Sequence, residues 1–367
     1  MKRLVCIIAC ITILLNVSTV SAYSISAKAA VVIDGYTGEI LYSQNCDTRL
    51  SMASTTKIMT ALLLCEMGGD LTKEIVTNRE MVTVEGSSMG LQVGDTVSYH
   101  DLLYGMMLAS GNDAANTTAI AIAGSVSKFV DLMNERATEM GLVDTHFVTP
   151  SGLDADGHYT TAYELALIAK EALENENFAK AAASQSATLR YGNPPYNRTL
   201  TNHNKLLKMH DDIVGVKTGF TKKSGRCLVS ASKKDGKFVI AVTLNDGNDW
   251  ADHRTLLDLG LSLIETKTFS PANSKTDIYT VNGNRITAEI PSATVNVTEN
   301  SAVTYQIYMP AFLYEPIKSG EQIGRICYYC NGSIVSDIPI TATKSINNSN
   351  NKFVLFFEIF KSIFSKV

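Results

Sequence analysis

A serine and a lysine three residues apart, in the segment Ser54-Thr55-Thr56-Lys57, precede a run of apolar residues with helical spacing. On a helix, residues i and i+3 share a face, so the Ser54 hydroxyl and the Lys57 amine can come within hydrogen-bond distance. A serine becomes nucleophilic when a neighbouring base accepts its proton, and a lysine can be that base where burial or a nearby cation lowers its pKa. The segment therefore predicts covalent catalysis by Ser54.

The Ser-x-x-Lys spacing is not specific by itself. It recurs in this chain at Ser125/Lys128, Ser230/Lys233 and Ser349/Lys352. A helix-capping serine followed by an exposed lysine is the alternative interpretation of such a segment. Two further motifs downstream distinguish Ser54 from the other serines.

The second motif, Ser110-Gly111-Asn112, opens a predicted helix over residues 114–123. A second hydroxyl can relay a proton between a lysine and a leaving amine, and the Asn112 amide can hold a substrate carbonyl and fix the lysine. Because Ser and Asn are also preferred N-cap residues, helix capping is the alternative interpretation.

The third motif, Lys217-Thr218-Gly219, stands at the end of a predicted strand. An amine and a hydroxyl can together bind a terminal carboxylate, and a glycine lets substrate backbone lie against the strand edge. The N–H of Phe220 could pair with that of Ser54 as an oxyanion hole. An exposed junction between a strand and a turn is the alternative.

The three motifs in this order resemble those of the serine-type D-alanyl-D-alanine carboxypeptidases, which are low-molecular-mass penicillin-binding proteins of peptidase family S11. Ser-Gly-Asn is the form of the middle motif that is typical of these carboxypeptidases. The resemblance covers roughly residues 24–265 and continues into the β-rich region that follows. It includes the segments Asp34–Leu41, Ala53–Ala61, Pro150–Leu153 with His158-Tyr159, and Asn202–Leu207.

The resemblance implies a role for each motif residue. Ser54 would be the acyl-enzyme nucleophile and Lys57 its proton acceptor. Ser110 would relay protons and Asn112 would position the peptide. The substrate site would further comprise Lys217 and Thr218, which would bind the carboxylate of the terminal D-alanine, together with Gly219 and Phe220.

The implied reaction is removal of the terminal D-alanine from peptidoglycan pentapeptide stems, with β-lactam antibiotics as acylating inhibitors and with no cofactor or metal. Three positions depart from the family pattern or are open. Val214 stands before Gly215 where the family frequently has Asp or Asn. Met52 stands where the family usually has proline. Arg254 is a candidate for the additional arginine that some members use on the substrate carboxylate.

The fold class expected from the resemblance is α+β, with an antiparallel sheet covered by helices on both faces. Periodicity and turn signals predict the elements of residues 23–267 independently. The predicted strands are 30–33, 39–42, 214–217, 226–232 and 238–244, and the predicted helices are 54–66, 114–123, 127–140, 161–174 and 253–265. Short strands with turn signals at Asn282-Gly283 and Asn331-Gly332 predict a small all-β domain over residues 268–343.

Composition limits the possible functions. The chain has 367 residues, of which 45% are hydrophobic and 19% charged, so it can bury the core of two domains. A formal net charge of −4 gives no basic surface for nucleic acid. The six histidines form no His-x-x-Glu-His or similar cluster, which disfavours a metallopeptidase.

The two ends of the chain predict export and membrane attachment. Residues 1–22 combine a basic start, an apolar stretch and a small-x-small cleavage pattern at Val20-Ser21-Ala22, as in a secretory signal peptide. A polar linker at 344–351 precedes a segment, 352–367, whose apolar residues fall on one helical face. Sixteen residues of helix reach about 24 Å, which is short of a hydrocarbon core of about 30 Å. We therefore expect an amphipathic helix lying in the membrane surface, and a helix docked on the protein itself is the alternative.

Two other functions compete with the carboxypeptidase. A class A-like β-lactamase needs a base for deacylation, and Glu171–Asn175 has the spacing of that loop although it continues a helical pattern. A catalytically silent wall-binding or penicillin-sensing protein would be expected to lack part of the motif set, which is intact here.

Overall fold

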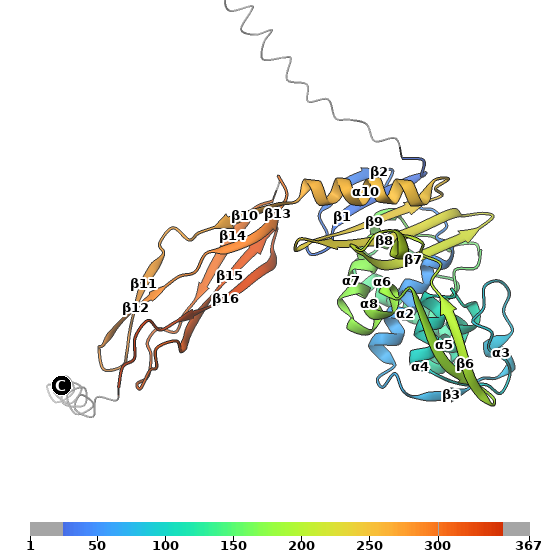
Figure 1. Cartoon of the computed structure of the whole chain (residues 1–367), viewed down its shortest axis with the longest axis horizontal. Coiled ribbons are helices and arrows are strands. Elements are labelled where there is room, and N and C mark those ends of the chain that lie inside the picture. The colour runs from blue at the N-terminus through green and yellow to red at the C-terminus, as the bar shows by residue number, and fades with distance from the viewer. Residues whose placement is uncertain (1–24, 300, 348–367) are drawn as a thin grey trace, which may run out of the picture.

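The computed structural model describes residues 25–299 and 301–347, which form a mixed α/β domain followed by an elongated β-rich module (Figure 1). The predicted signal peptide and the predicted amphipathic segment lie outside the described residues. Within the described ranges, none of the helices is long and apolar enough to cross a membrane.

The centre of the larger domain is a five-stranded antiparallel sheet with strand order β2-β1-β9-β8-β7. Its strands are β1 (Ala29–Asp34), β2 (Ile40–Gln44), β7 (Ile213–Thr221), β8 (Gly225–Lys234) and β9 (Lys237–Leu244). The predicted hairpin turns after β1 and at Asp235-Gly236 are both present. Strand β7, which carries the Lys217-Thr218-Gly219 motif, is an edge strand, so one side of it faces the rest of the domain rather than another strand of this sheet.

Helices cover both faces of the sheet, as expected. Side chains alternate between the two faces of a strand, and because both faces of the sheet are covered, β1 is buried along its whole length. Val31 and Ile33 belong to the core shared with α2 (Lys57–Met67), α7 (Ala162–Glu174) and α8 (Glu176–Ala183). Ala30 and Val32 belong to the core shared with α9 (Leu206–Met209) and α10 (Asp249–Leu263).

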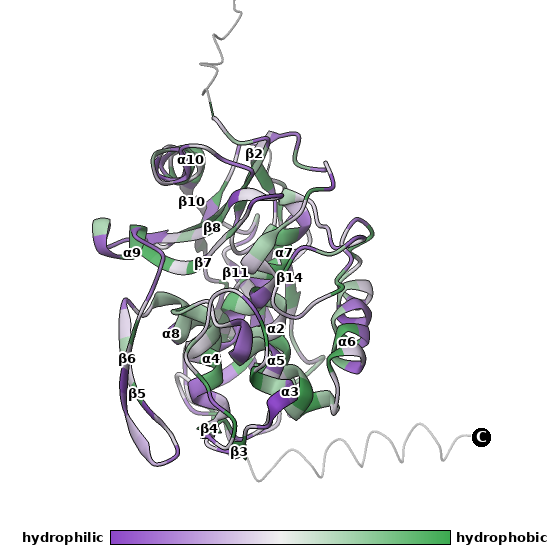
Figure 2. Ribbon diagram, turned by 90° about the vertical axis from the view of Figure 1, so that its right-hand side faces the viewer, coloured by the Kyte–Doolittle hydropathy of each residue, from purple (hydrophilic) through white to green (hydrophobic). Residues whose placement is uncertain are grey.

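A helical region packs beside the edge strand. It contains α3 (Arg79–Val82), α4 (Tyr99–Met107), α5 (Asn112–Ala123) and α6 (Val126–Glu139), together with a small sheet of β3 (Glu74–Val76), β4 (Thr96–Ser98), β5 (Ser186–Gly192) and β6 (Pro195–Thr201). Helix α6 buries Phe129, Met133 and Ala137 at a four-residue spacing, and Figure 2 shows its hydrophobic and hydrophilic sides. The small sheet was not expected, because its strands are short and largely exposed.

Two predicted helix boundaries need correction. The helix expected from Ser54 begins as a 3-10 turn, η1 (Ala53–Thr56), and becomes α-helical only at Lys57. The helix expected over 253–265 is α10, which begins at Asp249 and ends at Leu263, so that residue 265 already belongs to a strand.

Over residues 265–299 and 301–347, the β-rich module contains seven strands, and two of them, β10 (Glu265–Phe269) and β13 (Ala293–Val297), are not predicted by the sequence. These two pair with each other, β11 (Lys275–Tyr279) pairs with β12 (Arg285–Glu289), and β14 (Val303–Tyr308), β15 (Gln322–Cys330) and β16 (Ser333–Thr341) form a third sheet. Ile286, Ile326 and Ile340 are fully buried in its core.

The module also starts earlier and ends later than predicted. Strand β10 begins before the expected boundary at 267/268 because its partner β13 lies within the module. The linker expected from 344 begins later, because Ile346 forms a β-bridge with Ile317 and the Ser345 hydroxyl accepts a hydrogen bond from the Ser319 N–H at 2.9 Å.

The module forms hydrogen bonds with two turns of the larger domain. The Glu39 carboxylate, after the β1 turn, accepts hydrogen bonds from Thr298 Oγ1 at 2.8 Å and from Asn331 Nδ2 at 3.0 Å. Asn296 Nδ2 donates to the Gly236 carbonyl, in the turn between β8 and β9, at 2.8 Å. These contacts are at the end of the sheet away from the motif residues.

Candidate active site

A cavity of about 460 Å³ opens where the edge strand β7 meets η1 and the start of α5. It is lined by Ser54, Ser87, Ser110, His203, Thr218, Gly219, Phe220, Arg226, Asp249 and Trp250. Five of the eight predicted site residues are in this lining. The other three, Lys57, Asn112 and Lys217, are next to the cavity and are at most 4% exposed. The structure therefore brings together three motifs that lie far apart in the sequence.

The Ser54 side chain is presented by a tight, buried turn. Ala53 has a φ of 48°, in the left-handed region that few residues other than glycine adopt. The Thr55 and Thr56 hydroxyls donate to the carbonyls of Met52 and Ala53 at 2.6 and 2.8 Å. The N-cap of α2 is Thr56 and makes no side-chain cap bond, so Ser54 is not used to cap the helix.

The Lys57 side chain is completely buried, which rules out the alternative of an exposed lysine. Its Nζ lies 3.0 Å from Ser54 Oγ, 2.7 Å from Asn112 Oδ1 and 2.6 Å from the Ser151 carbonyl oxygen. The Lys57 amine is thus held next to Ser54 by two oxygens. One is from Asn112 of the second motif, and the other is the Ser151 backbone carbonyl, which the sequence does not single out.

These three distances define how a neutral lysine would be oriented. An amide oxygen and a backbone carbonyl can only accept hydrogen bonds, so they take the two N–H groups of a neutral amine. The remaining lone pair then faces Ser54, whose hydroxyl donates to it. Burial, and next the charge of Lys217, hold the pKa of Lys57 well below its ordinary value, whereas Asp113 acts in the opposite direction. This direction is the one that a lysine acting as a base requires.

Two glycines allow the backbone to approach the Ser54 turn closely. A Cβ at Gly152 would lie 1.9 Å from the Ala53 carbonyl oxygen, and Gly152 also has a φ of +84°. A Cβ at Gly219 would lie 3.0 Å from the Ser54 nitrogen and 3.1 Å from the Met52 carbonyl oxygen. The missing side chain of Gly219 thus faces the nucleophile turn, so packing as well as substrate access requires a small residue there.

Ser110 and Asn112 flank the start of α5 without capping it. The N-cap is Gly111, which has no side chain, and no side-chain cap bond is made. Ser110 has a φ of 55° and lines the cavity. Asn112 Nδ2 donates to the Glu85 carbonyl at 2.7 Å while its Oδ1 accepts from Lys57, so both ends of the amide are fixed.

Lys217 is more enclosed than its predicted contact with a substrate carboxylate suggests. It is 1% exposed, does not line the cavity, and donates from Nζ to the Thr218 carbonyl at 2.9 Å. Burial lowers the pKa of Lys217 to about 7. A carboxylate in the cavity would meet the Thr218 side chain first.

The prediction for Arg254 is wrong. Its guanidinium is paired with Asp212 at 3.1 Å and with Asp258 on the same helix, and it does not line the cavity. Arg226 lines the cavity instead, with a side chain that is 51% exposed and 2.9 Å from Asp249. The signal that could have found Arg226 is strand register, because Arg226 pairs with Phe220 across the β7–β8 hairpin.

The buried His158 takes part in local hydrogen bonds. His158 Nδ1 accepts from the Val148 N–H at 2.9 Å, so Nε2 carries the proton and donates to Thr56 Oγ1 at 2.8 Å. Burial lowers the pKa of His158 to about 4. His203, in contrast, lines the cavity.

Comparison with known proteins agrees with this geometry. Residues 16–248 match the family model described as D-alanyl-D-alanine carboxypeptidase, and residues 272–348 match the model described as penicillin-binding protein 5, C-terminal domain. The chain belongs to the D-alanyl-D-alanine carboxypeptidase family. The predicted family and the predicted enzyme class, a serine-type carboxypeptidase, are confirmed.

The relatives and solved structures cover most of the chain. The D-alanyl-D-alanine carboxypeptidase DacF of Bacillus subtilis is 31% identical over 90% of this chain and 88% of its own length. The carboxypeptidase DacC of Escherichia coli is 30% identical over 89% of this chain and 86% of its own. The crystal structure of DacD from Francisella tularensis is similar with a TM-score of 0.64 and 27% identity, covering 89% of this chain and 95% of that one.

The family assignment favours the carboxypeptidase over the β-lactamase, and so does the position of Glu171. This residue lies on α7, and its carboxylate accepts from Arg136 Nη2 at 2.6 Å. It does not line the cavity, and Asn175 is the N-cap of α8. Residues 171–175, whose spacing matches that of a deacylation loop, therefore form the end of α7 and its junction with α8.

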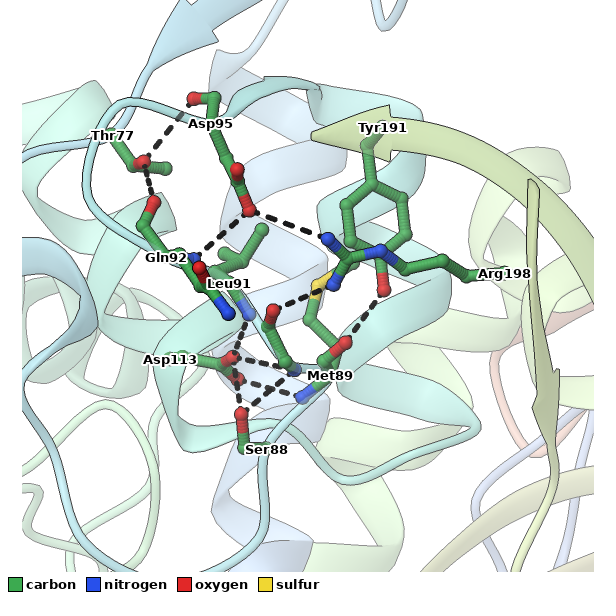
Figure 3. A network of polar contacts seen from close by, with 10 residues as sticks. Thr77, Ser88, Met89, Leu91, Gln92, Asp95, Asp113, Tyr191 and Arg198 are labelled. Carbon is green, nitrogen blue, oxygen red and sulfur yellow. Dashed lines mark hydrogen bonds and ion pairs between the residues drawn. The ribbon is translucent and has the colours of Figure 1, made fainter. Parts of the chain in front are cut away.

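Asp113 is a buried residue of the site that sequence reasoning missed. Its carboxylate accepts hydrogen bonds from Ser88 Oγ at 2.6 Å and from the N–H groups of Met89, Gly90 and Leu91 at 3.0–3.1 Å (Figure 3). These hydrogen bonds fix the loop between α3 and β4, which forms part of the cavity wall through Ser87. The same loop supplies the Glu85 and Ser87 carbonyls that hold Asn112.

The β5–β6 hairpin contacts the loop between α3 and β4 from its other side. Arg198 Nη1 donates to the Gly90 carbonyl at 2.6 Å, and its guanidinium lies 4.4 Å from the ring centre of Tyr191 and 3.5 Å from Asp95 (Figure 3). The Tyr191 hydroxyl donates to the Met89 carbonyl at 2.6 Å. Asp113 and Arg198 therefore position Asn112 indirectly, through the loop.

We predict that Asp113→Asn lowers kcat on a D-alanyl-D-alanine peptide by roughly 100-fold, because a small displacement of Asn112 and Lys57 costs that much. Loss of the Asp113 charge also removes an interaction that raises the pKa of Lys57. The acid limb of the pH profile of kcat/KM should therefore move to lower pH. Asp131→Asn, on the exposed side of α6, is the matched control. An unchanged rate and pH profile for Asp113→Asn would show that the loop does not position the site.

Proposed function

We propose that Ser54 attacks the carbonyl carbon of the D-alanyl-D-alanine peptide bond in peptidoglycan pentapeptide stems. The new Oγ–C bond forms, the C–N bond breaks, and the Ser54 proton passes through Lys57 to the leaving nitrogen, which departs as D-alanine. Water then attacks the ester, returns a proton to Ser54 and releases the shortened peptide. The observation that carries this proposal is the buried Lys57 amine, held 3.0 Å from Ser54 Oγ by two acceptors.

The remaining motif residues act around this transfer. Ser110 lines the cavity and relays the proton to the leaving amine. The N–H groups of Ser54 and Phe220 stabilise the oxyanion, a role supported by the close approach of Gly219 to the Ser54 nitrogen. Burial, and next the charge of Lys217, keep the pKa of Lys57 low, and Asn112 holds Lys57 and positions the peptide.

The terminal carboxylate of the substrate is bound by Thr218 and Arg226. Both line the cavity, and Arg226 retains a half-exposed guanidinium beside Asp249. A guanidinium matches the geometry of a carboxylate. β-Lactam antibiotics would acylate the same serine, since they offer a carbonyl and a carboxylate to these groups.

The enzyme acts outside the cytoplasm and is held at the membrane surface. The signal peptide pattern of residues 1–22 supports export, and the amphipathic pattern of residues 352–367 supports attachment. The site of action is then the outer face of the cytoplasmic membrane and the adjacent cell wall.

The first test is covalent labelling with penicillin. Intact mass should show one adduct on the mature chain, and peptide mapping should place it on Ser54. Ser54→Ala should lose the adduct and on the order of 10⁴-fold or more in rate. Ser87→Ala, which removes another hydroxyl from the cavity wall, should keep the label. An adduct that survives in Ser54→Ala would refute the assignment.

The second test is the pH dependence of kcat/KM. Because protonated Lys57 has no lone pair for the Ser54 proton, activity should be low in acid and should rise as the pH passes the lowered pKa of Lys57. Lys57→Arg should be inactive, since a guanidinium does not release its proton. Lys128→Arg, at another Ser-x-x-Lys spacing and exposed, is the control and should behave as wild type. A profile that stays flat from mildly acidic to alkaline pH would contradict a neutral lysine base.

The third test concerns the carboxylate. Arg226→Gln should raise KM for a D-alanyl-D-alanine peptide by roughly 10-fold, because a hydrogen bond to a charged group is lost. Arg254→Gln is the matched control, since Arg254 is paired with Asp212 and Asp258 outside the cavity. A substrate amidated at its terminal carboxylate should bind both variants equally. If Arg254→Gln shows the larger effect, the carboxylate assignment to Arg226 fails.

A further inference from the structure

Three aromatic side chains are exposed at the end of the β-rich module that lies farthest from the carboxypeptidase domain. They are Tyr279, Phe312 and Tyr314, with exposed fractions of 52%, 48% and 73%. The end of the module that they occupy comprises residues 279–285, 309–320 and 342–347, and we call it the distal tip. Figure 1 shows β11 and β12 reaching this end.

The exposure of Phe312 and Tyr314 is fixed by the backbone of the tip. Leu313, between them, is buried in the module core, and its backbone bonds to Tyr279 at 3.0 Å and to Val281 at 2.9 Å. Alternation along an extended segment therefore turns the two flanking side chains outward. Their rings are 5.6 Å apart in an edge-to-face arrangement, so they form one small apolar surface.

The chain leaves the described structure at this same tip. Ile346 forms backbone hydrogen bonds with Ile317 at 2.8 and 2.9 Å, and Ile317 is three residues after Tyr314. The amphipathic segment begins at Lys352, five residues after the last described position. Five residues of extended chain span at most about 18 Å. A membrane that holds residues 352–367 is therefore within about 18 Å of the tip.

The charges of the tip suit an anionic surface. Arg285, Lys318 and Lys344 are exposed there, and Arg285 is paired with Asp277 of the neighbouring strand at 3.5 Å. The tip contains one acidic residue, Glu315, and Glu321, directly after the tip, accepts from the backbone N–H of Lys318 at 2.9 Å. The Glu315 carboxylate is turned inward and accepts from the side chains of Thr280, Asn282 and Asn284 at 2.6–2.7 Å.

We infer that the distal tip is a second membrane contact, in which Phe312 and Tyr314 enter the interface of an anionic bilayer and the basic residues lie at its headgroups. A tyrosine favours this region of a bilayer because its ring is apolar and its hydroxyl is polar, and the Phe312 ring adds apolar surface. The inference rests on the proposed attachment by residues 352–367. Two contacts instead of one would fix the direction in which the module stands on the membrane.

The direct test uses the full mature chain with one reporter. Trp250, the single tryptophan of the sequence, is changed to phenylalanine, and Phe312→Trp is added. With phosphatidylglycerol-containing vesicles, the emission should shift to the blue and should be quenched by brominated acyl chains. Tyr305→Trp in the same background is the matched control. Tyr305 is 42% exposed on β14, but its hydroxyl contacts Ala272 rather than the tip, and its emission should not change.

Flotation of the same chain with the vesicles separates the possible failures. A chain that floats while Phe312→Trp stays unquenched attaches through its C-terminal segment alone, which overturns the tip contact and leaves the attachment intact. A chain that does not float overturns the attachment and the tip contact with it. Either result leaves the proposed peptidase chemistry untouched.

A second measurement gives the contribution of the tip to binding. The variant Phe312→Ser/Tyr314→Ser should weaken vesicle partitioning of the full chain by roughly 10-fold, because the apolar surface of two rings is no longer buried. Hydrolysis of a soluble D-alanyl-D-alanine peptide should be unchanged, and Tyr305→Ser should partition as wild type. Loss of binding to isolated cell walls with unchanged vesicle partitioning would show that the tip recognises the wall and would overturn the inference.

Discussion

The burial of Lys57 is the constraint on which the rest of the site depends. An ammonium group removed from water without a carboxylate partner is costly, so the buried amine is favoured in its neutral form. Asn112 and Ser151 offer oxygens that accept its two N–H groups but carry no full charge. They orient the lone pair without stabilising the cation as a carboxylate would.

Keeping this amine buried requires close backbone packing around η1. Gly152 lies against the Ala53 carbonyl, and Gly219 places the edge strand β7 against the Ser54 amide. Ala53 and Ser110 both have positive φ angles, which cost of order 1–3 kcal/mol each and persist only where the surroundings determine them. Here those surroundings are the two glycine contacts and the loop that Asp113 and Arg198 hold.

The sequence predicts the parts of this arrangement that depend on local spacing. The Ser54–Lys57 pair, the amphipathic helices and the hairpins of the main sheet follow from periodicity and turn residues. The Ser151 carbonyl and the Asp113 bonds depend on which distant segments meet, and a single sequence contains no signal for that. Strands β10 and β13 were missed for the same reason, because each short strand is stabilised by the other, more than twenty residues away in the sequence. The place of Arg226 follows from the register of the β7–β8 hairpin, where it pairs with Phe220.

The positions of the basic residues agree with the two opposite tasks that we propose for the site. Proton transfer from Ser54 needs an uncharged amine, and binding a terminal carboxylate needs a cation. Lys57 and Lys217 are 0% and 1% exposed, and burial lowers the pKa of both, whereas the Arg226 guanidinium is 51% exposed at the rim. Only the first turn of α10 reaches the cavity, through Asp249 and Trp250, so Arg254 lies about one turn farther along and pairs with Asp212 instead. With the roles that we propose, the fold separates the base from the cation that binds the carboxylate by depth, with the neutral amine inside and the permanent charge in contact with water.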